Sequence, residues 1–271
     1  MASYEDNIHN LRAERDRKTS SDPLHWLNLA GLFWLEEGEN SFGSSSQNKI
    51  VLPAFPGANC GSFHFKNGLV TLHADDNAGV TVNGNPPDDC PLRTDKDSKS
   101  DMIEIGSLTM KIIIRGGVPL VRIWDRESQA VKNFPGFHYY PVKPEYRIAA
   151  KYIRYNPPKP IKVMEIIGTE IDSSFLGQAQ FTLNGIECTL EAEKSGDKLL
   201  FNFTDGTNKE TTYGGGRRFY LPVPEGNEII LDFNLTENWP CAYTPFATCP
   251  IPMRENRLPI KIEAGELKYH E

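Results

Sequence analysis

The chain has 271 residues, of which 39% are hydrophobic and 24% charged, and its formal net charge is −7. Such a chain can bury a core, and its length fits one large β domain or two small ones. The negative charge argues against nucleic acid as a partner, and no apolar run approaches the roughly 18 residues of a membrane span.

The N-terminal segment, residues 1–36, is predicted to be helical. Ile8, Leu11 and Arg15 share one face of a helix over residues 5–19, and charged residues fill the rest of its surface. The polar start has no apolar core of the kind that secretory signals carry, so we expect a cytoplasmic protein.

Two further features complete this segment. Pro23, preceded by residues that can cap a helix, is expected to begin a second short helix. The dense apolar set that follows, ending at Trp34, favours a buried core over a platform for a ligand.

The rest of the chain has the pattern of antiparallel β structure. Short apolar runs are separated by turn signals, including Asn-Gly pairs at 67–68 and 83–84 that suit tight hairpins. The predicted fold class is therefore all-β, with sandwich-like or barrel-like sheets and a short N-terminal helix. We expect a sandwich-like half over 37–125, a connector over 126–160 containing a stiff proline-rich stretch, and a second β half over 161–271.

Residues 42–114 resemble the strand pattern of a forkhead-associated phosphopeptide-binding domain, as in "FGSSSQNKIVLP" and "GSFHF". Such domains carry an arginine just after the first glycine, whereas Gly43 is followed here by Ser44. The family's Ser-x-x-His is also altered, because one residue only separates Ser62 from His64. The resemblance implies a β-sandwich without phosphothreonine binding.

The familiar catalytic and metal-binding motifs are absent from the sequence. It has no nucleophile elbow, zinc-protease motif or phosphate loop, so we expect no cofactor. The five cysteines are scattered without a C-x-x-C pair, which favours free thiols in a reducing compartment. Cys241 and Cys249 could meet across a loop, but zinc needs two further ligands and only His138 is a candidate, so we predict no metal site.

The stretch "TTYGGGRRFYLP" is the first part of a candidate ligand site. Three glycines allow a close backbone approach, and the guanidinium groups of Arg217 and Arg218 suit a carboxylate or phosphate. Alternation along a strand points the two arginines to opposite faces, so one only is expected to face a ligand. A structural salt bridge, for example to Asp232, is the competing interpretation.

The segment "LDFN" supplies the second part. Asp232 and Asn234 fall on one strand face and could line a polar pocket or anchor the loop that follows. Tyr213, Trp34 and Tyr139 are candidates to cover an apolar part of the ligand. The sequence adds Asn256, at the end of a proline-rich loop predicted to form a rigid wall beside these residues.

Several motifs together resemble one family of microbial proteins, domain of unknown function 1684. They are "GLFWLEEGENSFGS", "FPGFHYYPVKPEYRIAAKY", "TYGGGRRFYLP", "LDFN" and "CAYTPFATCPIPMRENRLPIKIEAGE". The likeness extends over about residues 20–266, with one departure, because the family commonly has two prolines where this chain has Trp239-Pro240. The resemblance implies that the terminal loop, the Gly-Arg segment and "LDFN" belong together, and it implies no activity.

These observations favour a protein that binds a small anionic or polar ligand in the C-terminal β half. If it is an enzyme, hydrolysis or isomerisation by a carboxylate base is the simplest class, because no organic cofactor motif is visible. The alternative is a protein-binding module that uses the sandwich-like half. The sequence indicates neither the reaction nor the oligomeric state.

Overall fold

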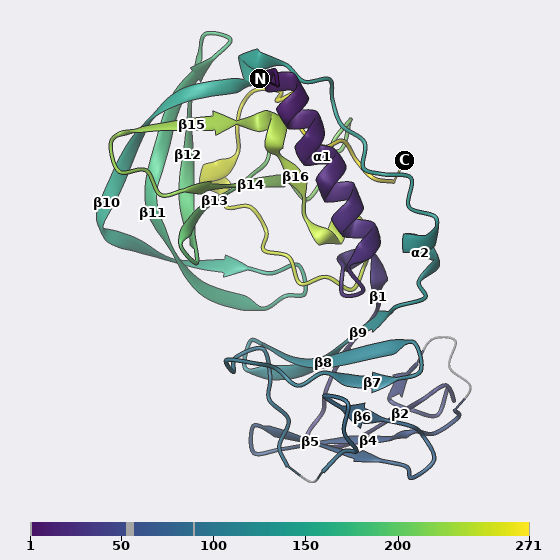
Figure 1. The fold of residues 1–271 in the computed structure, drawn as a ribbon. Coiled ribbons are helices and arrows are strands. Elements are labelled where there is room, and N and C mark those ends of the chain that lie inside the picture. Colours follow the sequence, from purple (N-terminus) through teal and green to yellow (C-terminus); the bar gives the residue numbers. More distant parts are fainter. Residues whose placement is uncertain (1, 53–56, 89, 271) are drawn as a thin grey trace. The chain divides into compact units, whose positions relative to one another are not determined.

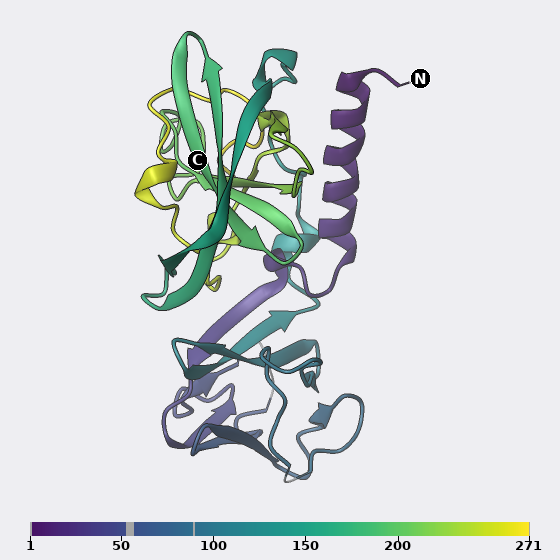
Figure 2. The same ribbon diagram turned by 90° about the vertical axis from the view of Figure 1, so that its left-hand side faces the viewer.

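The computed structural model describes residues 2–52, 57–88 and 90–270. The chain forms two compact units, shown as ribbons in Figures 1 and 2. The discontinuous unit combines Met1–Lys18 with Pro135–Glu271, and the continuous unit is Thr19–Phe134. Both consist mainly of antiparallel strands, which confirms the predicted all-β class, and the sheets are not closed into a barrel.

The continuous unit contains two sheets around one apolar core. The five-stranded sheet has the order β1-β9-β8-β7-β6, and the four-stranded sheet has the order β3-β2-β4-β5. Buried residues of both sheets, such as Phe42, Phe63, Met110 and Ile123, belong to the same cluster. The elements are η1 (Trp26–Asn28), β1 (Leu29–Trp34), β2 (Gly38–Gly43), β3 (Ile50–Val51), β4 (Gly61–Lys66), β5 (Leu69–Ala74), β6 (Thr81–Val82), β7 (Ile103–Ile105), β8 (Leu108–Arg115), β9 (Val118–Asp125) and α2 (Gln129–Lys132).

The end of the segment predicted to be helical is a strand. Residues 29–34 pair with β9, and the short helix expected at Pro23 is reduced to the three-residue η1, capped by His25. In β1, Leu29 and Gly31 are buried, and Ala30, Leu32 and Phe33 are half-buried. Trp34, at its end, is 44% exposed and does not belong to the core that we predicted for it.

The discontinuous unit contains one strongly twisted sheet of seven strands. The strand order is β15-β10-β11-β12-β13-β14-β16, and Figure 2 shows the twist of its long strands. The core of this unit includes an aromatic cluster with Phe203, Phe219 and Phe233. The elements are α1 (Tyr4–Ser21), η2 (Pro144–Tyr146), β10 (Arg147–Met164), β11 (Glu170–Leu183), β12 (Ile186–Ser195), β13 (Lys198–Phe203), β14 (Arg217–Pro222), β15 (Glu228–Asp232), η3 (Phe233–Leu235), β16 (Glu237–Asn238), η4 (Pro240–Ala242) and η5 (Arg254–Asn256).

The proline-rich stretch that we predicted as part of a connector lies inside β10 instead. β10 pairs with β11 on both sides of this stretch, and the register shifts between Arg154 and Lys159. Proline donates no backbone hydrogen bond, so Pro157 and Pro158 interrupt the ladder without ending the strand, whereas Pro160 is paired with Ser174.

Helix α1 packs on the discontinuous unit mainly through polar contacts. Of the predicted apolar face, Ile8 is 3% exposed, whereas Leu11 is 50% exposed. Arg12 donates hydrogen bonds to the backbone oxygens of Tyr140, at 3.0 Å, and Asn234, at 3.2 Å. The helix is rich in charge, and within the described residues no helix is long and apolar enough to cross a membrane.

Ile8 and Leu11 form a matched pair for testing how α1 is held. Ile8→Ala is expected to lower the free energy of unfolding by about 2–4 kcal/mol, because it removes a buried side chain and leaves a cavity. Leu11→Ala, on the exposed side, is the control and should change it by less than about 0.5 kcal/mol. Urea denaturation followed by circular dichroism measures both, and equal losses would contradict the docking described above.

Candidate functional site

Arg217 is fully buried at the start of β14, and its guanidinium binds other groups of the protein. It lies 2.9 Å from the Asp205 carboxylate and donates to the backbone oxygens of Ile262, at 2.8 Å, and Ala264. Gly216 precedes it with φ near +90°, where a Cβ atom would come within 2.6 Å of a carbonyl oxygen. Arg217 therefore fixes the terminal segment to the sheet and leaves no donor facing solvent for a ligand. The salt bridge predicted as the competing interpretation exists, but its partner is Asp205 and not Asp232.

Asp232 and Asn234 are buried and bind the helix α1 and the loop before β10. Asp232 accepts hydrogen bonds from the Tyr4 hydroxyl at 2.9 Å and from the Asn234 N–H at 3.1 Å. The Asn234 amide exchanges hydrogen bonds with both backbone groups of Lys143, at 3.0 and 2.9 Å. Burial, and then the hydrogen bond to Asp232, raise the pKa of Tyr4 to about 12. These contacts hold α1 and the loop before β10, and the two roles considered from the sequence, lining a pocket or anchoring the loop that follows, stay predictions.

Tyr139 and Asn234 line a small recess beside α1, together with Arg12, Arg15 and Glu237. Its volume is about 40 Å³, whereas small-molecule sites usually occupy about 300–1,000 Å³. Tyr139 also accepts a hydrogen bond from Arg15 at 2.8 Å, and its ring lies under the Arg12 guanidinium. The recess has room for about one water molecule, so it is not a ligand pocket.

Asn256 ties the terminal loop to the sheet. Its side-chain oxygen accepts a hydrogen bond from the Glu191 N–H at 2.7 Å. Its amide donates to the backbone oxygens of Glu191, at 3.0 Å, and Asn202, at 2.9 Å. With all three bonds made to backbone groups, Asn256 is a structural clamp.

A buried network between Arg15 and Glu266 was missed at the level of sequence. Arg15 lies 2.9 Å from the Glu266 carboxylate and 3.2 Å from that of Glu237, and it donates to the Tyr243 hydroxyl at 2.9 Å. The pKa of Glu266 is raised, because burial outweighs the attraction of Arg15. No local sequence pattern connects Arg15 with Glu266, because the two residues are 251 positions apart.

Arg218, the neighbour of Arg217, lies on the other face of β14 and is half-buried. Its guanidinium carbon is 4.1 Å from the centre of the Trp239 ring. The indole N–H of Trp239 donates to Asn202 at 2.7 Å, which fixes the ring under the arginine. Among the described residues, the Arg218 guanidinium has no hydrogen-bonding or carboxylate partner, and its Nε is buried without one. This group retains its capacity to bind an anion.

Two cysteines of the terminal loop meet next to Arg218. The backbone N–H of Cys241, in η4, points at the sulfur of Cys249 at 3.3 Å, and the two side chains hydrogen-bond to one another. Cys249 is 5% exposed and packs with Trp239, whereas Cys241 is half-exposed. The Tyr213 hydroxyl also hydrogen-bonds to Cys241, and its ring lies against Gly215, where a Cβ atom would come within 2.4 Å of it.

This environment favours the thiolate form of Cys241. The hydrogen bond from Cys249 lowers the pKa of Cys241 to about 7, against the effect of burial, and the Tyr213 hydroxyl and Arg218 act in the same direction. A half-exposed thiolate beside an unpaired guanidinium is both a nucleophile and part of an anion site. Sequence analysis named both cysteines but considered them as metal ligands, and the sequence does not show that a tyrosine and an arginine from other segments surround them.

We define the dithiol cluster as Tyr213, Arg218, Trp239, Cys241 and Cys249. Of the eight predicted site residues, Arg218 and Tyr213 alone belong to it. Trp34 belongs to the other compact unit. The remaining five have the structural contacts described above. No group of three or more possible metal ligands occurs among the residues that the structure describes.

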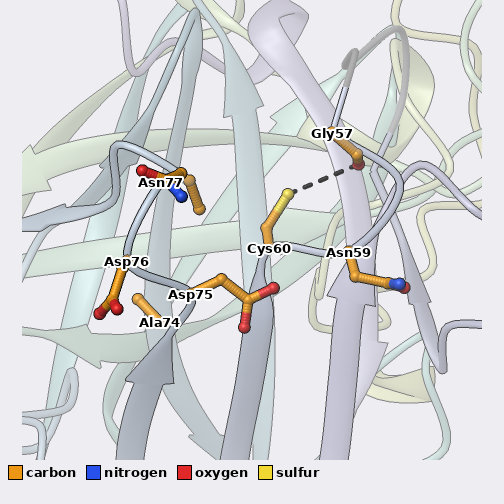
Figure 3. Close-up of a pocket in the computed structure, with 8 residues that line it drawn as sticks. Gly57, Asn59, Cys60, Ala74, Asp75, Asp76 and Asn77 are labelled. Carbon is orange, nitrogen blue, oxygen red and sulfur yellow. Dashed lines mark hydrogen bonds between the residues drawn. The ribbon is translucent and has the colours of Figure 1, made fainter.

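A larger hollow, of about 790 Å³, lies in the continuous unit at the end of β5 (Figure 3). Asp75 and Asp76 follow the strand there, and the Cys60 thiol donates to the backbone oxygen of Gly57 at 3.5 Å. Burial raises the pKa of Cys60, so this thiol is unreactive. Acidic side chains on an open hollow do not by themselves define a ligand.

Comparisons with known proteins identify a family without a described function. The sequence profile of a family described as "Protein of unknown function (DUF1684)" matches residues 132–267. This range is narrower than the resemblance drawn from the motifs, and it corresponds to the discontinuous unit without α1. No curated protein matches the chain.

One similar solved structure is the solution NMR structure of an uncharacterised protein from Haloarcula marismortui. The two sequences are 29% identical, and the match covers 50% of this chain and 78% of the other with a TM-score of 0.42. The forkhead-associated resemblance is not confirmed by these matches and stays a prediction.

The structural role of Arg217 can be tested by removing its partner. Asp205→Ala is expected to lower the free energy of unfolding by about 3–5 kcal/mol, because it leaves a buried guanidinium without a counter-charge. The control is Glu210→Ala, which breaks the exposed ion pair with Lys261 and should leave the denaturation midpoint nearly unchanged. A small effect of Asp205→Ala in urea denaturation would show that the buried pair does not hold the terminal segment.

Proposed function

Because the chain belongs to the DUF1684 family, whose description carries no activity to transfer, we propose a function from the site itself: the discontinuous unit binds a small anion at Arg218. The observation that supports this is the Arg218 guanidinium, which is held in place yet has no acceptor among the described residues. The other arginines around it, Arg15 and Arg217, are paired with carboxylates.

The surroundings of Arg218 favour a ligand with a single negative charge. Glu237 is its partner across the β14–β16 ladder and adds a carboxylate to this edge of the sheet. A nearby carboxylate repels a polyanion more strongly than a monoanion. Tyr220, 40% exposed, lies 5.5 Å from the guanidinium and provides an apolar neighbour. A small carboxylate with an apolar or aromatic part fits these contacts better than a nucleotide does.

The proposal does not use Asp232 as a catalytic base. Its carboxylate accepts hydrogen bonds from Tyr4 and Asn234 and is buried, so a substrate would have to displace α1 to reach it. The sequence suggested hydrolysis or isomerisation by a carboxylate base without naming the residue, and the geometry does not support Asp232 in that role. Binding of the anion is the part of the original hypothesis that remains.

The alternative, a protein-binding module in the continuous unit, stays a prediction. Exposed apolar side chains do occur there, among them Trp34, Val51 and Leu69, on three different strands. No specific contact favours this function over the anion site.

Thermal denaturation with a panel of anions tests the proposal. Acetate, benzoate, inorganic phosphate and a phosphate monoester are added at 10 mM to the full chain and to Arg218→Gln. A ligand at 100 times its dissociation constant stabilises the folded state by about 2.7 kcal/mol. We expect a rise in melting temperature with at least one carboxylate, its loss in Arg218→Gln, and its retention in Arg254→Gln, which changes an exposed arginine.

Native mass spectrometry of freshly purified protein complements the panel, because it detects a ligand that none of the added anions represents. The proposal fails if no anion stabilises the wild type more than Arg218→Gln and no bound molecule is lost on that substitution.

A further inference from the structure

The dithiol cluster carries an inference that does not depend on anion binding. We propose that Cys241 is a reactive thiol that is oxidised by hydroperoxides, and that Cys249 converts the oxidised product into an intramolecular disulfide. The structure holds both residues as free cysteines. The two cysteines lie close together, they differ in exposure, and the groups around them can stabilise charge.

The two cysteines are near enough to form a disulfide. The Cys249 sulfur is 3.3 Å from the peptide nitrogen of Cys241, and an N–Cα bond is about 1.46 Å, so this sulfur lies within about 4.8 Å of the Cys241 Cα. Disulfides span about 4.4–6.8 Å between Cα atoms, with a sulfur of each residue in between. Both cysteine side chains also pack in one cluster with Leu200, Trp239 and Ala247.

Their unequal exposure assigns a role to each. Cys241 is half-exposed in η4, so a small oxidant can reach it from solvent. Cys249 is buried against Leu200, Trp239 and Ala247, so the reagent that reaches it first is the oxidised side chain of Cys241. This is the arrangement of an attacking cysteine with a resolving cysteine behind it.

The neighbouring groups stabilise the charges that the reaction needs. Cys249 and Tyr213 donate hydrogen bonds to the thiolate of Cys241, and the positive charge of Arg218 lies nearby. The same positive charge and the phenolic hydroxyl can stabilise the oxygen that leaves when the peroxide bond breaks. Arg218 can do so because it has no carboxylate partner among the described residues.

The reaction has two steps, and the oxidant is a hydroperoxide. In the first, the Cys241 thiolate attacks the terminal peroxide oxygen, so that an S–O bond forms and the O–O bond breaks. The leaving oxygen takes up a proton and departs as water or an alcohol, while the sulfur is oxidised to sulfenic acid. In the second step, the Cys249 sulfur attacks the Cys241 sulfur. The S–O bond breaks, the thiol proton joins the departing hydroxide, and water is released with the disulfide.

The other cysteines provide internal controls. Cys60 and Cys188 are buried, and burial raises the pKa of both thiols, so both should be inert. Cys90 is exposed but has no second cysteine with which to form an intramolecular disulfide among the described contacts. A Cys90→Ser background therefore removes the one competing accessible thiol.

The test uses the full chain in the Cys90→Ser background, reduced, freed of reductant and treated with stoichiometric hydrogen peroxide. Trypsin releases both cysteines of the cluster on the single peptide 219–254, because no lysine or arginine lies between. We expect this peptide to lose two hydrogens and to resist alkylation until it is reduced. Cys249→Ser should stop at the sulfenic acid, trapped by dimedone on Cys241, and Cys241→Ser should abolish peptide oxidation.

The pH profile of Cys241 oxidation, together with substitutions of Arg218, distinguishes a positioning role of Arg218 from a structural one. Because the pKa of Cys241 is lowered to about 7, its oxidation rate should be half-maximal near pH 7 and fall tenfold for each unit below it. Arg218→Gln should slow the reaction several-fold, and Arg218→Lys, which keeps the charge, should restore much of the rate. Circular dichroism of each variant checks that the fold is intact.

Three results would overturn the inference. One is a wild-type peptide 219–254 that keeps both thiols while Cys60 or Cys188 is oxidised. Another is a wild type that stops at the sulfenic acid as the Cys249→Ser variant does. The last is a rate that does not change between pH 5 and pH 8. Anion binding by the Cys241→Ser variant is measured separately. Because this variant cannot undergo the oxidation, its binding of anions tests the proposed function independently of the dithiol reaction.

Discussion

The buried ion pair between Arg217 and Asp205 is the constraint around which the discontinuous unit is arranged. Two charges without solvent need further hydrogen bonds to be stable, and the backbone oxygens of Ile262 and Ala264 accept such bonds from the two Nη atoms of Arg217. The pair therefore holds the terminal segment in one position. That segment in turn brings Glu266 to Arg15, so the helix α1 depends on it as well.

Two adjacent arginines illustrate how a strand separates structural from chemical roles. Arg217 and Arg218 are consecutive, so the pleat of β14 directs one to the interior and the other to the opposite face. The interior arginine meets a carboxylate and backbone oxygens, whereas the guanidinium of the other lies over the Trp239 ring without an acceptor among the described residues. Arg218 therefore keeps its capacity to bind an anion, and the thiols of Cys241 and Cys249 lie next to it.

The sequence predicted the all-β class, the N-terminal helix and the alternation that separates the two arginines, because these follow from local periodicity and turn chemistry. It did not predict the partner of Arg217, since Asp205 follows β13 in a turn whose position depends on the whole sheet. It also took the prolines of β10 for a boundary, although a strand can skip ladder bonds at proline and continue. The meeting of Tyr213 with Cys241 was not predictable because three strands, β14, β15 and β16, separate them along the chain.

The discontinuous unit is split by the continuous one, and this has a consequence for the order in which the chain is made. Helix α1 leaves the ribosome before the continuous unit, whereas Glu266, the buried partner of Arg15, is translated about 250 residues after Arg15. The continuous unit, Thr19–Phe134, has its own core in one stretch of chain and can fold during that interval. Glu266 neutralises Arg15, and the backbone oxygens of Ile262 and Ala264 accept hydrogen bonds from Arg217, so residues 262–266 are needed for both arginines. Until these residues emerge, Arg15 lacks its Glu266 partner and Arg217 lacks two of its acceptors, so the discontinuous unit can complete its packing only after the continuous unit has been made.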